Sequence, residues 1–314
     1  MTKLRISIVE YLNTAPLVWG FTDGPLVGRY DLSFTVPSKC ADALRSGDAD
    51  VAIIPAIEYQ RMENVVILPE MAVAAKGEVR SILVIARKPI ELAKRVALDT
   101  SSRSSAALVQ LLCRNFWGIS PEFVQADPDP AAMLANADAA LVIGDPALRI
   151  AVKLEQLAEK KPNGEFCCGG DPNDQPVAGV DSLYVYDVAH QWREMTARPC
   201  VLAVWAARRE VVTSELVADF IASKKFGMSN ISDLADGAAL KLDLPSRPLG
   251  RYLRENIDFW LDAENIAGLE LYYKLCAEAG LIDRAKPIEF ALFKNNLSSS
   301  NSQNAETGKV IQNR

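Results

Sequence analysis

Histidine is almost absent from this chain of 314 residues, in which His190 is the only example. A Ser-His-Asp hydrolase needs a histidine beside its nucleophile, and many catalytic zinc sites bind the metal through several histidines. A single histidine therefore argues against a hydrolytic triad and against a multi-histidine metal centre.

Paired cysteines are lacking as well. None of the six cysteines forms a Cys-x-x-Cys pair, and most lie inside apolar stretches. The adjacent Cys167 and Cys168 could indicate redox or metal chemistry, but two unreactive thiols are the simpler interpretation in a reducing compartment. We therefore expect no bound metal.

Long apolar runs are absent too, so that no segment can span a bilayer. Met1 to Arg5 lead directly into the apolar residues 6–9, without an apolar signal segment or a small-residue cleavage site. These absences predict a cytoplasmic protein without a membrane partner. At the other end, residues 297–314 are rich in Ser and Asn, lack periodicity and are expected to form a flexible tail.

Positive charge is not in excess. The 34 basic residues face 40 acidic ones, which gives a formal net charge of -6. Nucleic acids attract basic surfaces, so we expect no nucleic-acid partner. A local cationic pocket for a small anion is compatible with this balance.

Short apolar runs alternate with helical patterns through the first half of the chain. Strands are expected at residues 4–9, 31–36 and 51–54, with a helix from Ser38 to Gly47 between the last two. Further strands are expected at 81–86, 96–98, 123–124, 139–143, 183–186 and 201–205. This order favours an α/β fold with a mostly parallel sheet.

The length suits two domains, but no Gly/Ser-rich linker divides the chain. We therefore expect the chain to cross between two lobes through strands, near residues 86–96 and again near 199–209. The first predicted lobe comprises residues 1–90 and 205–290, and the second comprises residues 91–204. A cleft between two such lobes is a favoured place for a ligand.

A polar turn follows the first strand, where open α/β sheets bind ligands. It reads Glu10-Tyr11-Leu12-Asn13-Thr14-Ala15-Pro16. The Asn13 amide could hold a hydroxyl or a carboxylate. On spacing alone, a helix cap formed by Asn13 or Thr14 is the better interpretation.

The most polar turn, residues 99–105, carries five hydroxyls and one guanidinium between a strand and a helix. It reads Asp99-Thr100-Ser101-Ser102-Arg103-Ser104-Ser105. A helix N-terminus favours an anion by up to about 1 kcal/mol. Because so many hydroxyls exceed what capping needs, we predict a carboxylate pocket. The spaced glycines and lysine of a nucleotide-binding P-loop are missing.

Two shorter motifs are less informative. Arg80-Ser81 opens a strand, where an ordinary edge serine is the simpler explanation. Gly144-Asp145-Pro146 opens a helix. Asp145 could act as a base, but an aspartate cap followed by proline explains it well.

Together these segments resemble the chorismate dehydratases of the futalosine route to menaquinone. The resemblance covers roughly residues 4–282 and rests mainly on the first turn and on Ser102-Arg103-Ser104-Ser105. Segments 44–55, 80–81, 203–206 and 252–257 extend it. The family more often has threonine in place of Ser104, a change that keeps the hydroxyl.

The resemblance implies the two-lobed fold of type II periplasmic binding proteins, with the ligand cleft between the lobes. It implies a carbon–oxygen lyase (a hydro-lyase) that converts chorismate into 3-[(1-carboxyvinyl)oxy]benzoate and water without a metal or an organic cofactor. The implied catalytic residues are Asn13 and Ser81. The implied substrate-binding residues are Tyr11, Leu12, Thr14, Ser38, Pro55, Arg80, Thr100, Ser101, Ser102, Arg103, Ser104, Ser105, Gly144 and Asp145.

These turns contain no histidine or lysine to serve as the base. We therefore expect the enolpyruvyl carboxylate of the substrate to remove the C3 proton, since well-oriented intramolecular reactions gain roughly 7–11 kcal/mol. Asn13 and Ser81 would orient the substrate and the leaving group, and residues 100–105 would hold negative charge. Asp145 is the rival base.

Two alternatives share the fold. A solute-binding module for a small carboxylate would bind without turnover and usually carries an export signal. The sister enzyme of the same route, which makes dihydroxynaphthoate, usually has a Ser-Pro-Cys-Pro-Asn-like first turn, which this chain lacks. The sequence leaves open whether the chain forms a homodimer and which turn would bind which carboxylate.

Overall fold

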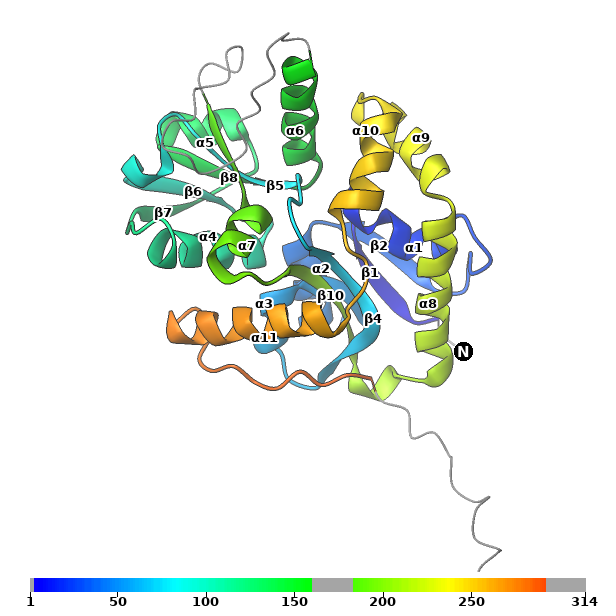
Figure 1. Ribbon diagram of the computed structural model, residues 1–314. Coiled ribbons are helices and arrows are strands. Elements are labelled where there is room, and N and C mark those ends of the chain that lie inside the picture. The colour runs from blue at the N-terminus through cyan, green and yellow to red at the C-terminus, as the bar shows by residue number, and fades with distance from the viewer. Residues whose placement is uncertain (1–2, 160–182, 292–314) are drawn as a thin grey trace, which may run out of the picture.

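The computed structural model describes residues 3–159 and 183–291, which form two lobes around one five-stranded sheet each (Figure 1). Lobe 1 is the part built on the first sheet, and lobe 2 is the part built on the second. The strand order is β2-β1-β3-β10-β4 in lobe 1 and β7-β6-β8-β5-β9 in lobe 2. The expected tail at 297–314 and the Cys167-Cys168 pair lie outside the described residues.

Both sheets follow one pattern of pairing. The strands of lobe 1 are β1 (Arg5–Val9), β2 (Asp31–Thr35), β3 (Val51–Pro55), β4 (Val65–Ala75) and β10 (Cys200–Arg208). Those of lobe 2 are β5 (Ile82–Ala86), β6 (Arg95–Asp99), β7 (Glu122–Ala126), β8 (Ala139–Ile143) and β9 (Tyr184–Asp187). β10 is antiparallel to β3 and β4, and β5 is antiparallel to β8 and β9. The other pairings are parallel, so the α/β class is confirmed with two mixed sheets.

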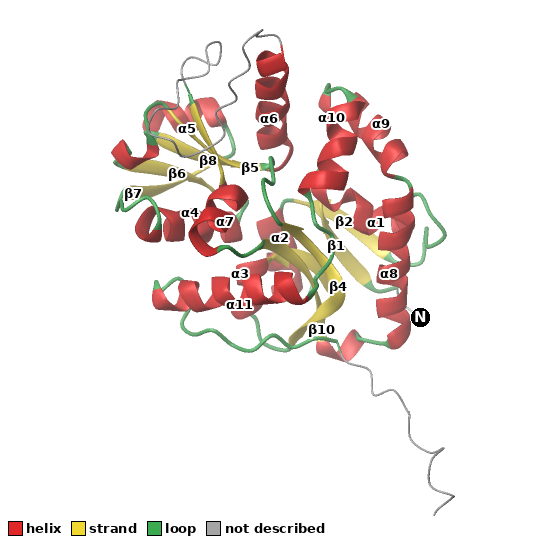
Figure 2. Ribbon diagram, viewed as in Figure 1, coloured by secondary structure: helices red, strands yellow, loops and turns green. Residues whose placement is uncertain are grey.

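Helices flank both sheets (Figure 2). In lobe 1 they are α1 (Ala15–Thr22), α2 (Pro37–Ser46), α3 (Ala56–Gln60), α8 (Ser214–Ser229), α9 (Ile231–Leu242), α10 (Ser246–Arg251) and α11 (Ala263–Glu278). In lobe 2 they are α4 (Arg103–Asn115), α5 (Pro130–Asn136), α6 (Gly144–Glu159) and α7 (Val188–Thr196). α2 ends at Ser46 and is capped by Gly47, whose φ of 84° suits glycine, as the sequence predicted.

The chain changes sheets twice. β4 ends at Ala75 in the first sheet and β5 begins at Ile82 in the second, so residues 76–81 form the first crossing, which we call the crossover segment. The return lies between Asp187 and Cys200. The first change comes earlier in the chain than the sequence suggested, because β5 belongs to lobe 2. The return, between α7 of lobe 2 and β10 of lobe 1, lies at the start of the range 199–209 that the sequence suggested.

A continuous apolar core runs through both lobes. Ile8 and Val204 of the first sheet belong to the same buried cluster as Leu108 and Leu112 of α4 in lobe 2. α11 packs against β10, α3 and α4 and thus touches both lobes (Figure 2). Packing therefore holds the lobes together in addition to the chain crossings, and the turns at the strand ends meet between them.

Candidate functional site

A narrow cavity lies between the lobes, which we call the interlobe cavity. The volume of this cavity is about 40 Å³. Its lining is Val9, Tyr11, Asn13, Thr14, Pro37, Pro55, Val73, Ile82, Ser102, Ser105, Ile143, Gly144, Leu202 and Ala203. Seven of the residues proposed from the sequence are among them: Tyr11, Asn13, Thr14, Pro55, Ser102, Ser105 and Gly144. Segments far apart in the sequence thus meet at one place.

The first turn places Asn13 in this cavity without a partner. Residues Leu12–Thr14 form a short 3-10 helix before α1, and neither Asn13 nor Thr14 caps α1 with its side chain. The Thr14 hydroxyl instead donates to the carbonyls of Val9 (2.6 Å) and Tyr11 (2.9 Å). Among the described residues nothing hydrogen-bonds the half-buried Asn13 amide. The capping interpretation is therefore wrong, and the amide is free for a ligand.

The serine-rich turn uses most of its polar groups internally. Ser102 is the cap of α4: its hydroxyl accepts from the Ser105 N–H at 3.4 Å and donates to the Ser105 hydroxyl at 2.7 Å. The N–H and the hydroxyl of Ser101 donate to one Asp99 oxygen, at 2.8 and 2.5 Å. Thr100 has an exposed side chain, and its N–H donates to Ala126. Ser102 and Ser105 are thus the hydroxyls that reach the interlobe cavity.

Arg103 turns toward lobe 1 and forms ion pairs. Its guanidinium donates to Glu58 at 3.1 Å and to Asp42 at 2.9 Å. Glu58 is only 1% exposed and also pairs with Arg45 and Arg61. A guanidinium placed between two carboxylates is already neutralised. Arg103 is therefore engaged with α2 and α3 and is not in the lining of the interlobe cavity.

Further hydrogen bonds of this turn join the lobes. The Ser38 N–H donates to the Ser101 carbonyl at 3.0 Å. The Ile57 N–H donates to the Ser104 hydroxyl at 3.1 Å. Ser38 and Ser104, both proposed from the sequence as substrate ligands, thus contribute to lobe closure.

Asp145 also bridges the lobes. It lies inside the first turn of α6, which begins at Gly144. The prediction that Asp145 caps this helix is therefore wrong. Its carboxylate accepts from the Leu12 N–H across the cleft at 3.0 Å. Burial raises the pKa of Asp145, and the Leu12 N–H opposes that rise.

Gly144 permits close contact with Tyr11. Its φ is +63°, and a Cβ atom there would lie 2.7 Å from the Tyr11 ring. Burial raises the pKa of the Tyr11 phenol, while a hydrogen bond with Ser101 opposes the rise. The Tyr11 ring therefore closes one side of the interlobe cavity against lobe 2.

Arg80 and Ser81 lie at the crossover segment. The Arg80 guanidinium pairs with Glu155 at 2.5 Å. The buried Ser81 hydroxyl accepts from the Tyr252 hydroxyl at 2.8 Å, and the Ser81 carbonyl accepts from the Gly144 N–H at 2.8 Å. Ser81 thus lies directly behind the cavity residues Ile82 and Gly144.

Asp99 is a group that sequence reasoning passed over. It is 1% exposed, and its second oxygen has no hydrogen-bond partner among the described residues. Burial raises the pKa of Asp99, and the two Ser101 hydrogen bonds oppose the rise. The position of Asp99 at the end of a predicted strand could have marked it as a candidate site residue. That one of its oxygens lacks a hydrogen-bond partner is visible only in the structure.

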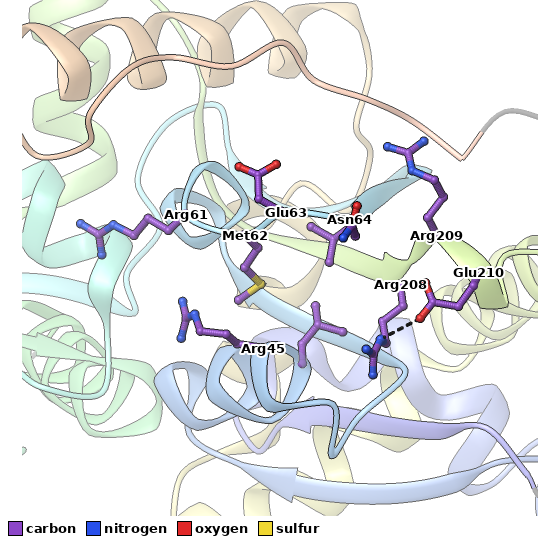
Figure 3. A pocket seen from close by; sticks show the side chains of 10 residues that line it. Arg45, Arg61, Met62, Glu63, Asn64, Arg208, Arg209 and Glu210 are labelled. Atoms are coloured by element: carbon purple, nitrogen blue, oxygen red, sulfur yellow. Dashed lines mark ion pairs between the residues drawn. The ribbon is translucent and has the colours of Figure 1, made fainter.

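Two of the hollows that are larger than the interlobe cavity differ from it in their lining. One of about 600 Å³, the outer hollow, shares Tyr11 and Thr14 with the interlobe cavity and is also lined by Trp19, Asp145 and Lys241. The other, of about 530 Å³, is ringed by arginines on lobe 1 (Figure 3). Those arginines are Arg45, Arg61, Arg208 and Arg209, and each is paired with an acidic residue.

No group of three or more His, Cys, Asp and Glu side chains is placed to hold a metal ion within residues 3–159 and 183–291. In the same ranges no helix is both long and apolar enough to cross a bilayer.

Solved structures share the fold at low sequence identity. A crystal structure of a protein from Archaeoglobus fulgidus has a TM-score of 0.68 and 18% identity, over 89% of this chain and 98% of that chain. The periplasmic aliphatic sulphonate binding protein of Escherichia coli has a TM-score of 0.55 and 19% identity, over 90% and 94% of the two chains. The ligand-binding component of an ABC-type import system from Staphylococcus aureus has a TM-score of 0.57 and 15% identity, over 91% and 94%. These similarities confirm the two-lobed fold of the periplasmic binding proteins.

Sequence comparisons identify the family. A curated chorismate dehydratase of Thermus thermophilus is 26% identical over 275 residues, which are 87% of this chain and 94% of that protein. The family model for menaquinone biosynthesis matches residues 4–278, the span in which the turns of the interlobe cavity lie. The resemblance drawn from the sequence is confirmed at this level, and the protein belongs to the menaquinone biosynthesis family.

Proposed function

We propose that this protein is a chorismate dehydratase, a carbon–oxygen lyase that forms 3-[(1-carboxyvinyl)oxy]benzoate and water. The observation that carries the proposal is the free Asn13 amide in a cavity built by turns of both lobes. The family membership and the Thermus thermophilus relative support it. A cytoplasmic location and a place in the futalosine route are part of the same proposal.

The proposed reaction breaks one C–H and one C–O bond. The C3 hydrogen is vinylogous to the ring carboxylate, so its removal as a proton gives an extended enolate. The enolate then expels the C4 hydroxyl, the ring becomes aromatic, and the hydroxyl leaves as water after taking up a proton. The balance requires no oxidant or reductant.

The substrate's own enolpyruvyl carboxylate is the proposed base. Asp145, the rival base, lines the outer hollow and not the interlobe cavity. It is also held by the Leu12 N–H. An internal carboxylate, by contrast, is delivered with the substrate and needs only to be oriented.

Asn13 would orient the substrate, and Ser102 and Ser105 would face a carboxylate. Chorismate needs more room than the present interlobe cavity has, so we propose that the lobes open to admit it. Opening would break the contacts of Asp145 with Leu12, of Ser101 with Ser38 and of Ser104 with Ile57. Reclosure would exclude water around the reacting groups.

Kinetics of Asn13→Ala and Asp145→Asn test this proposal. Removing a donor that stabilises developing charge costs about 10²–10³ in kcat, so Asn13→Ala should lose activity on that scale. Asp145→Asn keeps an acceptor for the Leu12 N–H and should stay within about threefold of the parent, a change of under 1 kcal/mol. Wild-type kcat in Asn13→Ala would remove its catalytic role.

A solute-binding role is the second candidate, because the fold is shared with periplasmic binding proteins. That role predicts a heat of binding for chorismate without any product.

A large fall in kcat for folded Asp145→Asn would make Asp145, and not the substrate's carboxylate, the base.

A further inference from the structure

The crossover segment holds one residue in a strained conformation immediately before Ser81. Arg80 has a φ of +60°, in the left-handed region that favours glycine. Strain of this kind persists only where the surroundings impose it, and it clusters at functional sites. The hydrogen bonds and ion pairs around Arg80 therefore show how the fold imposes this conformation.

The backbone of this segment is braced from both lobes. The N–H groups of Val79 and Arg80 donate to the Asp187 carboxylate of β9, at 3.1 and 2.6 Å. The Asn256 side-chain amide donates to the Glu78 carbonyl at 3.1 Å. These bonds fix the direction in which the chain enters β5.

The side chain of Arg80 is braced as well. Glu155 of α6 in lobe 2 pairs with Arg80 and with Arg251 of α10 in lobe 1. Arg80 is thus held through its backbone and through its guanidinium. Because Ser81 is the next residue, the fixed backbone of Arg80 also fixes the position of Ser81.

Tyr252 completes the bracing at Ser81 itself. It begins a π-helical turn, Tyr252–Asn256, and is 1% exposed. π-Helical turns are rare and are often found at functional sites. The Tyr252 hydroxyl donates to the Ser81 oxygen at 2.8 Å. Because that oxygen is an acceptor here, Ser81 keeps its own proton to donate, and no group of the described residues accepts it.

We infer that Tyr252 is a positioning residue for Ser81. Its hydroxyl occupies one acceptor site of the Ser81 oxygen, so that the Ser81 proton is left for the hydroxyl that departs from a substrate in the interlobe cavity. Ser81 itself is 1% exposed and lies behind the residues that line this cavity. Ile82 follows Ser81 in the chain, and the Gly144 N–H donates to the Ser81 carbonyl. Both Ile82 and Gly144 line the interlobe cavity. This inference rests on the proposed dehydratase activity and adds a residue that acts through Ser81.

A double-mutant cycle tests it. Tyr252→Phe removes one hydroxyl and keeps the ring, so kcat for chorismate should fall three- to tenfold, the loss of one neutral hydrogen bond. KM should change less than about twofold, because the ring and the backbone bracing remain. In a Ser81→Ala background the same change should have almost no effect on kcat.

Tyr59→Phe is the matched control. Tyr59 is also 1% exposed, and its hydroxyl bonds Pro287 and Glu289, away from the interlobe cavity. It should keep the parent kcat. All rates are compared well below the melting temperature of each variant, so that differences in folding do not enter.

The outcomes separate the inference from the proposed function. A wild-type protein that leaves chorismate unchanged overturns both. Normal turnover with an unchanged kcat in Tyr252→Phe overturns the inference alone. An equal loss in the Ser81 and Ser81→Ala backgrounds also overturns it, because a purely structural tyrosine acts independently of the serine.

Discussion

Asn13, Ser102 and Ser105 are the polar side chains that the interlobe cavity offers besides Tyr11 and Thr14. Arginine and lysine are missing from its described lining, so an anion there would be held by amide and hydroxyl donors. Such neutral donors recognise a carboxylate by direction and not by net charge. The position of each hydroxyl therefore decides the fit.

Gly144→Ala should weaken both stability and activity. The φ of +63° is unfavourable for alanine, and the new Cβ would meet the Tyr11 ring at 2.7 Å. We expect a loss of about 1–3 kcal/mol in the free energy of unfolding by urea, together with a lower kcat/KM. Gly118→Ala is the control: its φ is +66°, but no atom lies within 4 Å of the new Cβ. It should cost about 1 kcal/mol and leave kcat/KM unchanged. Equal kinetics in the two variants would contradict the Tyr11 contact.

Arg103→Ala should act on stability and spare KM. The guanidinium pairs with the buried Glu58, so its removal should cost about 1–2 kcal/mol of unfolding free energy after allowance for its partial exposure. Steady-state kinetics give KM. A rise in KM of tenfold or more at normal stability would show instead that Arg103 binds the substrate carboxylate, as the resemblance implies.

The sequence could place Asn13, Gly144 and the serine turn at the ends of strands, and the resemblance implied that all three meet the substrate. It could not assign Arg103 or Asp145, since their partners Glu58 and Leu12 are distant in the chain. Local pattern shows which groups occur at a turn. Only the fold shows which of them are already satisfied.

Among the elements, β4 and the crossover segment define the junction of the lobes. The sequence did not reveal β4, because Pro69 and Glu70 interrupt its apolar run. In the structure Glu70 has a φ of +65°, and the pairing with β10 shifts register. β5 is buried along its whole length, so its apolar residues do not show to which sheet it belongs. The strands themselves were largely predictable from their apolar runs.

Asp187→Asn should give a pH-dependent loss of stability. Burial raises the pKa of Asp187 to about 6, and the N–H groups of Arg80, His190 and Val79 oppose that rise. A raised folded-state pKa means that this group favours the folded state at low pH and loses that contribution as pH rises through about 6. The cost of Asp187→Asn should therefore be larger at pH 5 than at pH 7, by about 1 kcal/mol.

Urea unfolding of the parent and the variant at both pH values measures this difference. Comparing the pair at each pH cancels other carboxyls, such as Asp50 and Asp138, whose pKa values are lowered. A cost that is the same at both pH values would contradict the raised pKa.

At the scale of the molecule, one apolar cluster extends through both lobes, a second, smaller cluster lies within lobe 2, and the lobes enclose the site. The interlobe hydrogen bonds and the continuous apolar cluster favour the closed form, while the proposed substrate would need the narrow interlobe cavity to open. The net charge of -6 opposes the approach of a dianion.

Rising salt should therefore leave kcat/KM for chorismate unchanged or raise it slightly. Screening weakens repulsion between a negative protein and a negative substrate. Initial rates at low substrate concentration, measured from low to physiological ionic strength, give the dependence. A steep fall with salt would reveal a basic funnel and contradict this charge argument.

The most direct test of the central claim is to add the purified protein, with a chelator present, to chorismate and to follow ultraviolet absorbance and product mass. We expect the loss of one water and the appearance of an aromatic enol ether. Chorismate that stays unchanged, whether or not it binds, would contradict it.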